Sequence, residues 1–143
     1  MKKLLLIASL MGAALFMPVV ASTHSDVNEP LLHPADSYAE ITFDTLRIDL
    51  GTFPQSDPVR SCTFNYTNTG TAPLVIHQAF ASCGCTVPKY TKNPVKPGER
   101  GKIDVTYNGT GKFVGHFQKT ITVRTNATNE IVRLTIEGTM TEK

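Results

Sequence analysis

The sequence predicts an all-β protein, an antiparallel β-sandwich of seven to eight strands. From Tyr38 onward, short runs rich in Thr, Val, Ile, Phe and Tyr are separated by Gly, Pro and Asn. Several runs alternate apolar and polar residues, so that one face suits a core and the other suits water. No window has the periodicity of an amphipathic helix. Short strands at this spacing are typical of two packed sheets.

We expect eight strands, separated by turn-forming residues such as those at Pro97-Gly98 and Asn108-Gly109. Their predicted ranges are Ala39–Phe43, Arg47–Gly51, Val59–Asn68, Leu74–Phe80, Cys85–Tyr90, Gly101–Tyr107, His116–Thr125 and Ile131–Thr139. The alternation fixes which face of the longer strands points inward. The inward residues in chain order are Cys62, Phe64 and Tyr66, then Ile103, Val105 and Tyr107, then Phe117, Ile121 and Val123, then Val132, Leu134 and Ile136.

The first 21 residues are typical of a secretory signal peptide. Lys2 and Lys3 precede the apolar run Leu4–Val20, and small residues lead up to Ala21, where we expect cleavage. The run is about seventeen residues long, shorter than the roughly 20 of a membrane span. No cysteine follows that could carry a lipid, so we expect a protein of the periplasm or the extracellular space, without a membrane anchor after processing. Residues 22–37 then form a flexible leader, and residues 38–143 form the sandwich domain.

The charge balance gives no argument for binding nucleic acid. The 14 basic residues include Lys2 and Lys3, so the processed chain has 12 basic and 12 acidic residues. Residues 22–88 carry a net charge of −5 and residues 89–143 a net charge of +5. A self-complementary fold would explain this division, and so would self-association of copies head to tail.

The most reactive stretch is Ser82-Cys83-Gly84-Cys85-Thr86, which we expect at the bend after the fourth strand. The thiols of Cys83 and Cys85 could stay reduced and pack, close a small disulfide, or bind a soft metal ion. A disulfide of either one with Cys62 is a further alternative. A metal site would need more ligands, and the weak candidates are His77 and His116.

The geometry of extended chain favours a structural role for this stretch. Side chains at i and i+2 point the same way, so Cys83 and Cys85 should face one side together, inward if Phe80 and Cys62 line the neighbouring core. Gly84 would supply a positive φ if the bend requires one. On this hypothesis the thiols fill a space too small for leucine.

Several of these motifs together resemble a known family. Its pattern is matched by Asn68-Thr69-Gly70, Ser82-Cys83-Gly84-Cys85-Thr86, Pro97-Gly98 and Leu134-Thr135-Ile136-Glu137-Gly138. The stretch from about Ala39 to Met140 thus resembles the bacterial domain-of-unknown-function family numbered 1573. The resemblance implies an immunoglobulin-like sandwich, similar to Hydin-type and major-sperm-protein domains, and no established activity. Unlike antibody domains, the chain has no tryptophan and no cysteine in His116–Thr125 to pair with Cys62.

No catalytic constellation is recognisable, so we expect no enzyme and no cofactor. The chain has no Gly-x-Ser-x-Gly, thioredoxin-type Cys-x-x-Cys or phosphate-binding glycine motif. The function that we expect is a non-enzymatic cell-envelope module that presents loops or an edge strand to an unidentified protein partner. The alternative is a redox-active or copper- or zinc-handling periplasmic protein that uses Cys83 and Cys85.

Overall fold

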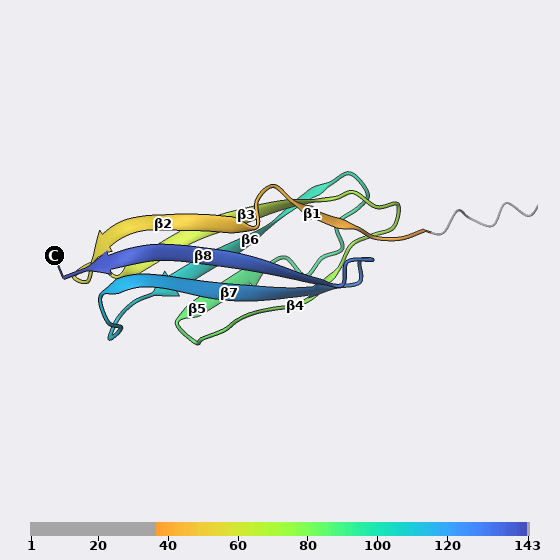
Figure 1. Cartoon of the computed structure of the whole chain (residues 1–143). Helices are drawn as coiled ribbons and strands as arrows, with labels where there is room; N and C mark the ends of the chain where they lie inside the picture. The colour runs from red at the N-terminus through yellow and green to blue at the C-terminus, as the bar shows by residue number, and fades with distance from the viewer. Residues whose placement is uncertain (1–36, 143) are drawn as a thin grey trace, which may run out of the picture. The chain divides into compact units, whose positions relative to one another are not determined.

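The computed structural model describes residues 37–142, which form eight strands and no helix. The strands are β1 (Ile41–Phe43), β2 (Arg47–Pro54), β3 (Val59–Asn68), β4 (Ile76–Ala81), β5 (Thr86–Tyr90), β6 (Arg100–Asn108), β7 (Gly115–Thr125) and β8 (Ile131–Thr141). The predicted all-β sandwich is confirmed (Figure 1). The predicted signal peptide and all of the predicted leader except Ser37 lie outside the described residues. Within the described part, no helix is available that could span a membrane.

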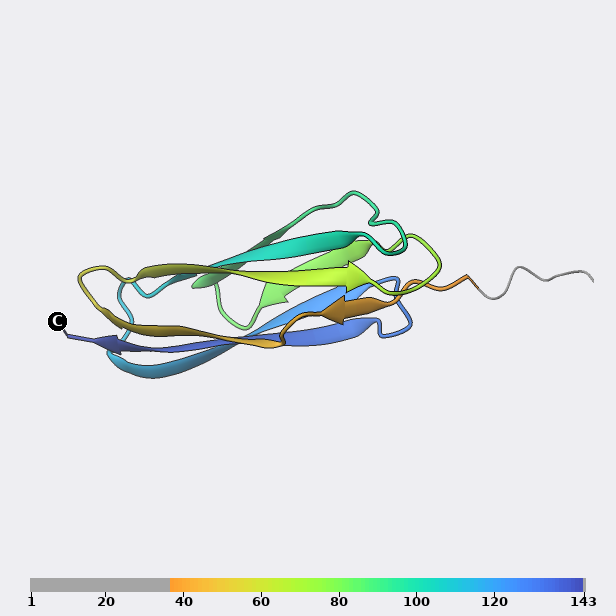
Figure 2. The same cartoon turned by 90° about the horizontal axis from the view of Figure 1, so that it is seen from above.

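Two four-stranded sheets pack face to face. Sheet I has the strand order β1-β3-β6-β5, and sheet II has the order β2-β8-β7-β4. Figure 2 shows the two layers from above, with the first strands passing from one layer to the other. The edge strands are therefore β1 and β5 in sheet I and β2 and β4 in sheet II. This is the arrangement of an immunoglobulin-like domain whose first strand is divided between both sheets.

One pairing departs from the predicted antiparallel arrangement. Strand β2 runs parallel to β8, with Arg47 opposite Thr135 and Phe53 opposite Met140. The chain crosses from sheet I to sheet II between β1 and β2 without reversing its direction, which brings β2 beside β8 in the same sense. The register shifts between Asp49 and Thr52, where Gly51 has a φ of 74°. This bulge lets the strand continue to Pro54 instead of ending at Gly51 as predicted.

Strand β4 begins two residues later than predicted. Leu74 exchanges backbone hydrogen bonds with Val95, in the segment between β5 and β6, with both N···O distances 2.8 Å. The pairing with β7 therefore starts only at Ile76. It contains a second bulge between Ile76 and Gln78, so that His77 is an extra residue in this strand.

The core lies between the sheets and is built from the predicted inward residues. Phe64, Tyr66, Ile103, Ile121 and Leu134 are fully buried. At one end of the core, the rings of Phe53, Tyr107 and Phe117 pack together, with Tyr107 stacked on Phe117 at a centroid distance of 4.1 Å. These aromatic contacts link β2, β6 and β7 and so hold the two sheets together.

Candidate functional site

The turn between β4 and β5 joins the edges of the two sheets. Its first residue, Ser82, donates its N–H to Thr120 O of β7 in sheet II at 2.9 Å. Its last residue, Cys85, accepts the N–H of Asn108 of β6 in sheet I at 2.8 Å. The two cysteines of the turn are joined by a disulfide, with their Cα atoms 5.3 Å apart. The bridge therefore lies where the chain passes from one sheet to the other.

The structure replaces the expected pair of packed thiols with this bridge. Cys83 and Cys85 are both half-buried, and Cys85 contacts the core. The hydroxyl of the buried Thr86 lies 3.8 Å from each sulfur. Gly84 does not have a positive φ, and a Cβ at this position would meet nothing within 4 Å. The bend therefore forms with an ordinary backbone conformation and does not require the positive φ that Gly84 could supply.

Cys62 is free and lies on the inner face of β3. Burial raises the pKa of its thiol to about 11. A thiol with this pKa stays protonated at neutral pH and is a poor nucleophile. Cys62 therefore acts as a small core residue, and the alternative bridge to Cys83 or Cys85 is not formed.

The candidate metal ligands do not lie close together in the structure. His77 lies at the bulge of β4, and His116 lies at the start of β7, opposite Thr139 of β8. Among residues 37–142, no group of three or more His, Cys, Asp and Glu side chains is arranged to hold a metal ion.

The outer edge of β4 carries open backbone groups. In an antiparallel pair, successive residues point their N–H and C=O groups alternately toward the partner and away from it. Since Ser82 bonds to β7, Phe80 faces β7 as well, and Ala79 and Ala81 direct their backbone groups outward. The carbonyl of His77 also points outward, where it accepts the hydroxyl of Tyr90 at 3.3 Å. Strand β4 has no paired strand on this side.

The other three edge strands carry features that oppose further pairing. Strand β1 has only three residues. Strand β2 has the bulge at Gly51 and ends in Pro54, and β5 contains Pro88 and Lys89. Short length, bulges, proline and lysine are the usual protections of an exposed edge. Between Gln78 and Ala81, β4 has none of them.

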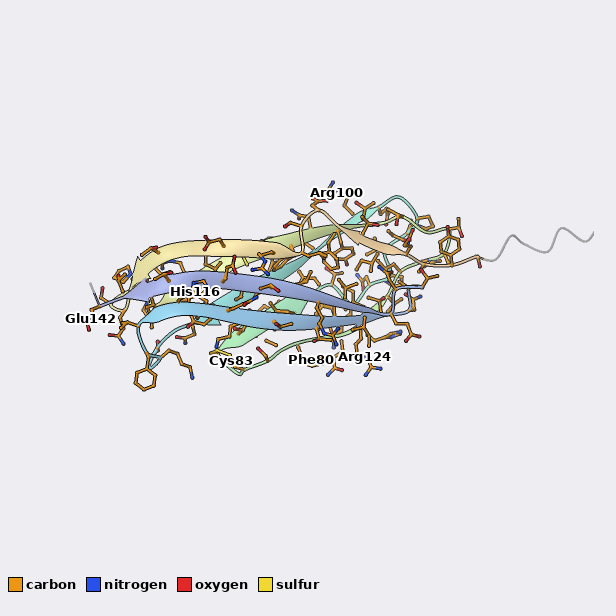
Figure 3. The ribbon with its side chains drawn as sticks, in the orientation of Figure 1. Phe80, Cys83, Arg100, His116, Arg124 and Glu142 are labelled. Carbon is orange, nitrogen blue, oxygen red and sulfur yellow. A yellow bond between two sulfur atoms is a disulfide. The ribbon has the colours of Figure 1, made fainter. Side chains whose placement is uncertain are left out.

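Exposed apolar and cationic side chains lie beside this edge on the outer face of sheet II. Phe80 is 44% exposed, so it does not line the core beside Cys62, which was the condition for cysteines that face inward. The bulge at His77 shifts the alternation by one residue and turns Phe80 outward. Ile131 is 49% exposed on the same face, and Arg124 lies opposite Gln78. Figure 3 shows Phe80 and Arg124 at the β4 margin of the sandwich.

A surface pocket of about 530 Å³ lies at the bulge. It is lined by His77, Gln78, Arg124, Thr125, Asn126 and Glu130. Arg124 makes no ion pair with any residue that the structure describes. Arg133, which is opposite Thr122 on the same face, makes none either. The binding surface beside β4 could not be recognised in the sequence. What distinguishes this strand is an absence, since it contains no charged residue and no proline.

The outer face of sheet I is different, because its polar groups bond to one another. The hydroxyl of Thr63 donates to Asp104 at 2.8 Å, and Lys102 forms an ion pair with the same carboxylate at 3.1 Å. These bonds lower the pKa of Asp104, with the hydrogen bond from Thr63 as the first cause. Ser61 and Thr106 are also hydrogen-bonded to each other. On the outer face of sheet II, by contrast, Arg124 and Arg133 have no ionic partner among the described residues.

Solved structures with a similar fold share little sequence with this chain. A protein of unknown function from Porphyromonas gingivalis W83 has a TM-score of 0.61 and 13% identity over 72% of this chain and 47% of that one. A PapD-like domain of human CEP192 has a TM-score of 0.53 and 12% identity, over 74% and 88%. The CupB2 chaperone of Pseudomonas aeruginosa has a TM-score of 0.52 and 15% identity, over 68% and 54%. This chain thus spans about half the length of two of the three.

The fold is an immunoglobulin-like β-sandwich, similar to PapD-like domains, and the candidate site is the edge of β4. Within this class, the pattern of the family described as "Protein of unknown function (DUF1573)" matches residues 41–140. The chain belongs to that family, and the resemblance seen in the sequence is confirmed. The comparison with curated proteins found no similar sequence.

Proposed function

We propose that this chain is an exported, non-enzymatic cell-envelope module that binds another protein through the edge of β4. The observation that carries the proposal is the stretch Gln78–Ala81 of this edge, which follows the bulge at His77 and has no proline, no charged side chain and no further bulge. An extended segment of a partner can add to such an edge by main-chain hydrogen bonds.

Three further points support the proposal. The exposed side chain of Phe80 beside the edge provides apolar contact area, and aromatic side chains are frequent anchors of protein interfaces. The sequence of residues 1–21 favours export. Membership of a family of unknown function and a PapD-like fold both fit a module without catalysis.

Site-specific crosslinking in cells tests the proposal. A photoreactive residue in place of Phe80 should form an adduct with another protein of the cell envelope. The matched control is the same residue in place of Thr63, on the outer face of sheet I, and it should form none. Equal adducts at both positions, or none at Phe80, would contradict a binding surface at β4.

The disulfide favours a redox function as the second candidate. Reduction of the bridge between Cys83 and Cys85 takes up two electrons and two protons and yields two thiols, which could then reduce a partner or bind Cu(I). Thiol counting and elemental analysis of protein isolated from the envelope separate the two functions. A stable count of one thiol, that of Cys62, supports the binding module. A count that follows the redox state of a partner, or a bound metal, supports the second candidate.

A further inference from the structure

We infer that the strand that pairs with β4 belongs to another protein and carries carboxylates on its outward face. This inference rests on the proposed function and names the class of partner. It follows from where the side chains of an added strand would lie, from the charge that they would meet, and from what a second copy of this chain would offer.

An added strand places alternate side chains beside two different surfaces. Its outward side chains lie next to Gln78 and Phe80, and its inward side chains lie next to the small residues Ala79 and Ala81. Neighbouring strands are about 4.8 Å apart, so Arg124 on β7 is about 10 Å from the added backbone. The side chains of an arginine and a glutamate together span this distance. Gln78, between them, can donate to the same carboxylate.

The charges near β4 are complementary to an acidic strand. Arg124 and Arg133 have no ionic partner among the described residues. The pocket at the bulge adds the imidazole of His77 and the amide of Gln78 as donors, against a single carboxylate, that of Glu130. A partner carboxylate next to Gln78 would form an ion pair with Arg124, and Arg133 would attract it at longer range.

A second copy of this chain is the less suitable partner. When two β4 edges pair, the outer faces of both copies lie on the same side of one continuous sheet. That face would then carry Arg124 and Arg133 from each copy near the join. The carboxylate of Glu137 on this face is already paired with Arg47 at 2.6 Å. Strand β4 of a second copy has no carboxylate to place beside Arg124, so a strand from a different, acidic protein fits better.

Defined peptides test the inference. The probe is a capped seven-residue peptide of alternating valine and glutamate, and the control has lysine in place of glutamate. Isothermal titration at low salt should show the acidic peptide binding about tenfold or more tightly, a preference of ~1.4 kcal/mol, and losing affinity as salt is raised. The same acidic peptide with methylated backbone nitrogens on the edge-facing side should not bind.

Protein variants locate the contact. Arg124→Gln should weaken the binding of the acidic peptide several-fold, and Glu130→Gln should strengthen it. Arg47→Gln is the matched control, because Arg47 is on the same sheet at the far edge and is already paired with Glu137. It should leave the affinity within twofold. Hydrogen exchange at the amides of Ala79 and Ala81 should slow in the complex.

The outcomes separate the inference from the proposed function. Equal binding of both peptides with slowed exchange at Ala79 would overturn the acidic partner and leave the β4 edge as a binding site. Dimers held through β4 in sedimentation, or an Arg124→Gln variant with unchanged affinity, would also overturn the inference. Absence of binding by any strand-forming peptide, together with absence of crosslinks at Phe80, would overturn both.

Discussion

Because of the buried thiol of Cys62, we expect the free energy of unfolding to decrease at alkaline pH. Burial raises its pKa to about 11 in the folded chain, whereas an exposed thiol titrates near 8.5. Between these values the unfolded chain has lost the proton and the folded chain has kept it, so the free energy of unfolding falls as pH rises. The stability contribution of this group is complete below about pH 8.5.

We therefore predict that wild-type protein loses stability more steeply between about pH 8.5 and 11 than the Cys62→Ala variant. Urea denaturation at several pH values measures both slopes. The variant will be less stable at neutral pH because it leaves a small cavity, so the comparison is of slopes. The burial of Tyr66 and Tyr107 raises their pKa in both proteins and does not distinguish them. Identical slopes would show that Cys62 is solvated.

Asn68 is the polar residue on which two loops depend. It is fully buried, and its amide nitrogen donates to Ala72 O at 2.8 Å and to Val95 O at 2.9 Å. Its side-chain oxygen accepts the N–H of Gly70 at 3.0 Å. The sequence predicts Asn68 as the last residue of a strand and as part of the motif Asn68-Thr69-Gly70, but not as buried, because burial of an asparagine cannot be recognised without knowing what surrounds it.

Asn68→Ala should lower the free energy of unfolding by about 3 kcal/mol, since it leaves several buried backbone groups without a partner. Asn65→Ala is the control, because Asn65 is exposed on the outer face of the same strand. It should change stability by less than about 0.5 kcal/mol. Chemical denaturation measures both. A small effect at Asn68 would mean that water replaces the lost bonds.

At the scale of elements, the bridge in the β4–β5 turn is predicted to contribute modestly to stability. It closes a loop of three residues, and in the chain-entropy account such a loop contributes about 1.5 kcal/mol. The Cys83→Ala, Cys85→Ala double variant should be less stable than the oxidised wild type by about 1–3 kcal/mol, with loss of packing included. Under reducing conditions the difference should shrink. If the double variant is as stable as the oxidised wild type, the bridge serves a reactive function instead.

Two glycines in turns next to β4 should respond differently to alanine. A Cβ on Gly70 would collide with the backbone of Tyr38 and Glu40, which cannot move without breaking the start of β1. A Cβ on Gly84 would meet nothing within 4 Å, and its φ is not positive. Gly70→Ala should therefore cost more than about 2 kcal/mol, and Gly84→Ala less than about 0.5 kcal/mol. Thermal unfolding compares them, and the reverse order would contradict this account.

The strands could be predicted from the sequence because alternation and turn residues are local signals. The long strands β3, β7 and β8 were placed to within two residues at each end. The bulges in β2 and β4 could not be predicted, since each depends on the partner strand. The bulge in β4 also explains why the side chain of Phe80 points outward. The open edge of β4 could not be predicted either, because the order of strands within a sheet is a property of the whole fold.

For the whole molecule, export remains a prediction from residues 1–21. The protein recovered from the periplasm or the medium should begin at Ser22, and its intact mass should lack the first 21 residues. Replacing Ala21 by a bulky residue should lead to accumulation of the uncleaved chain. Recovery of the full-length chain from the cytoplasm alone would contradict both the export and the envelope function.

The position of β8 determines when this domain can fold. It is the last of the eight described strands, yet it lies inside sheet II between β2 and β7. During synthesis or translocation, β2 therefore waits without a partner while some 75 further residues emerge, and β7 has only β4 beside it. A fold in which β2 pairs with β8 is slow to nucleate because the pairing joins residues far apart in the sequence, and its strands are exposed to wrong pairing until β8 is available. A nascent chain should thus leave strands of sheet II unpaired until Ile131–Thr141 has emerged.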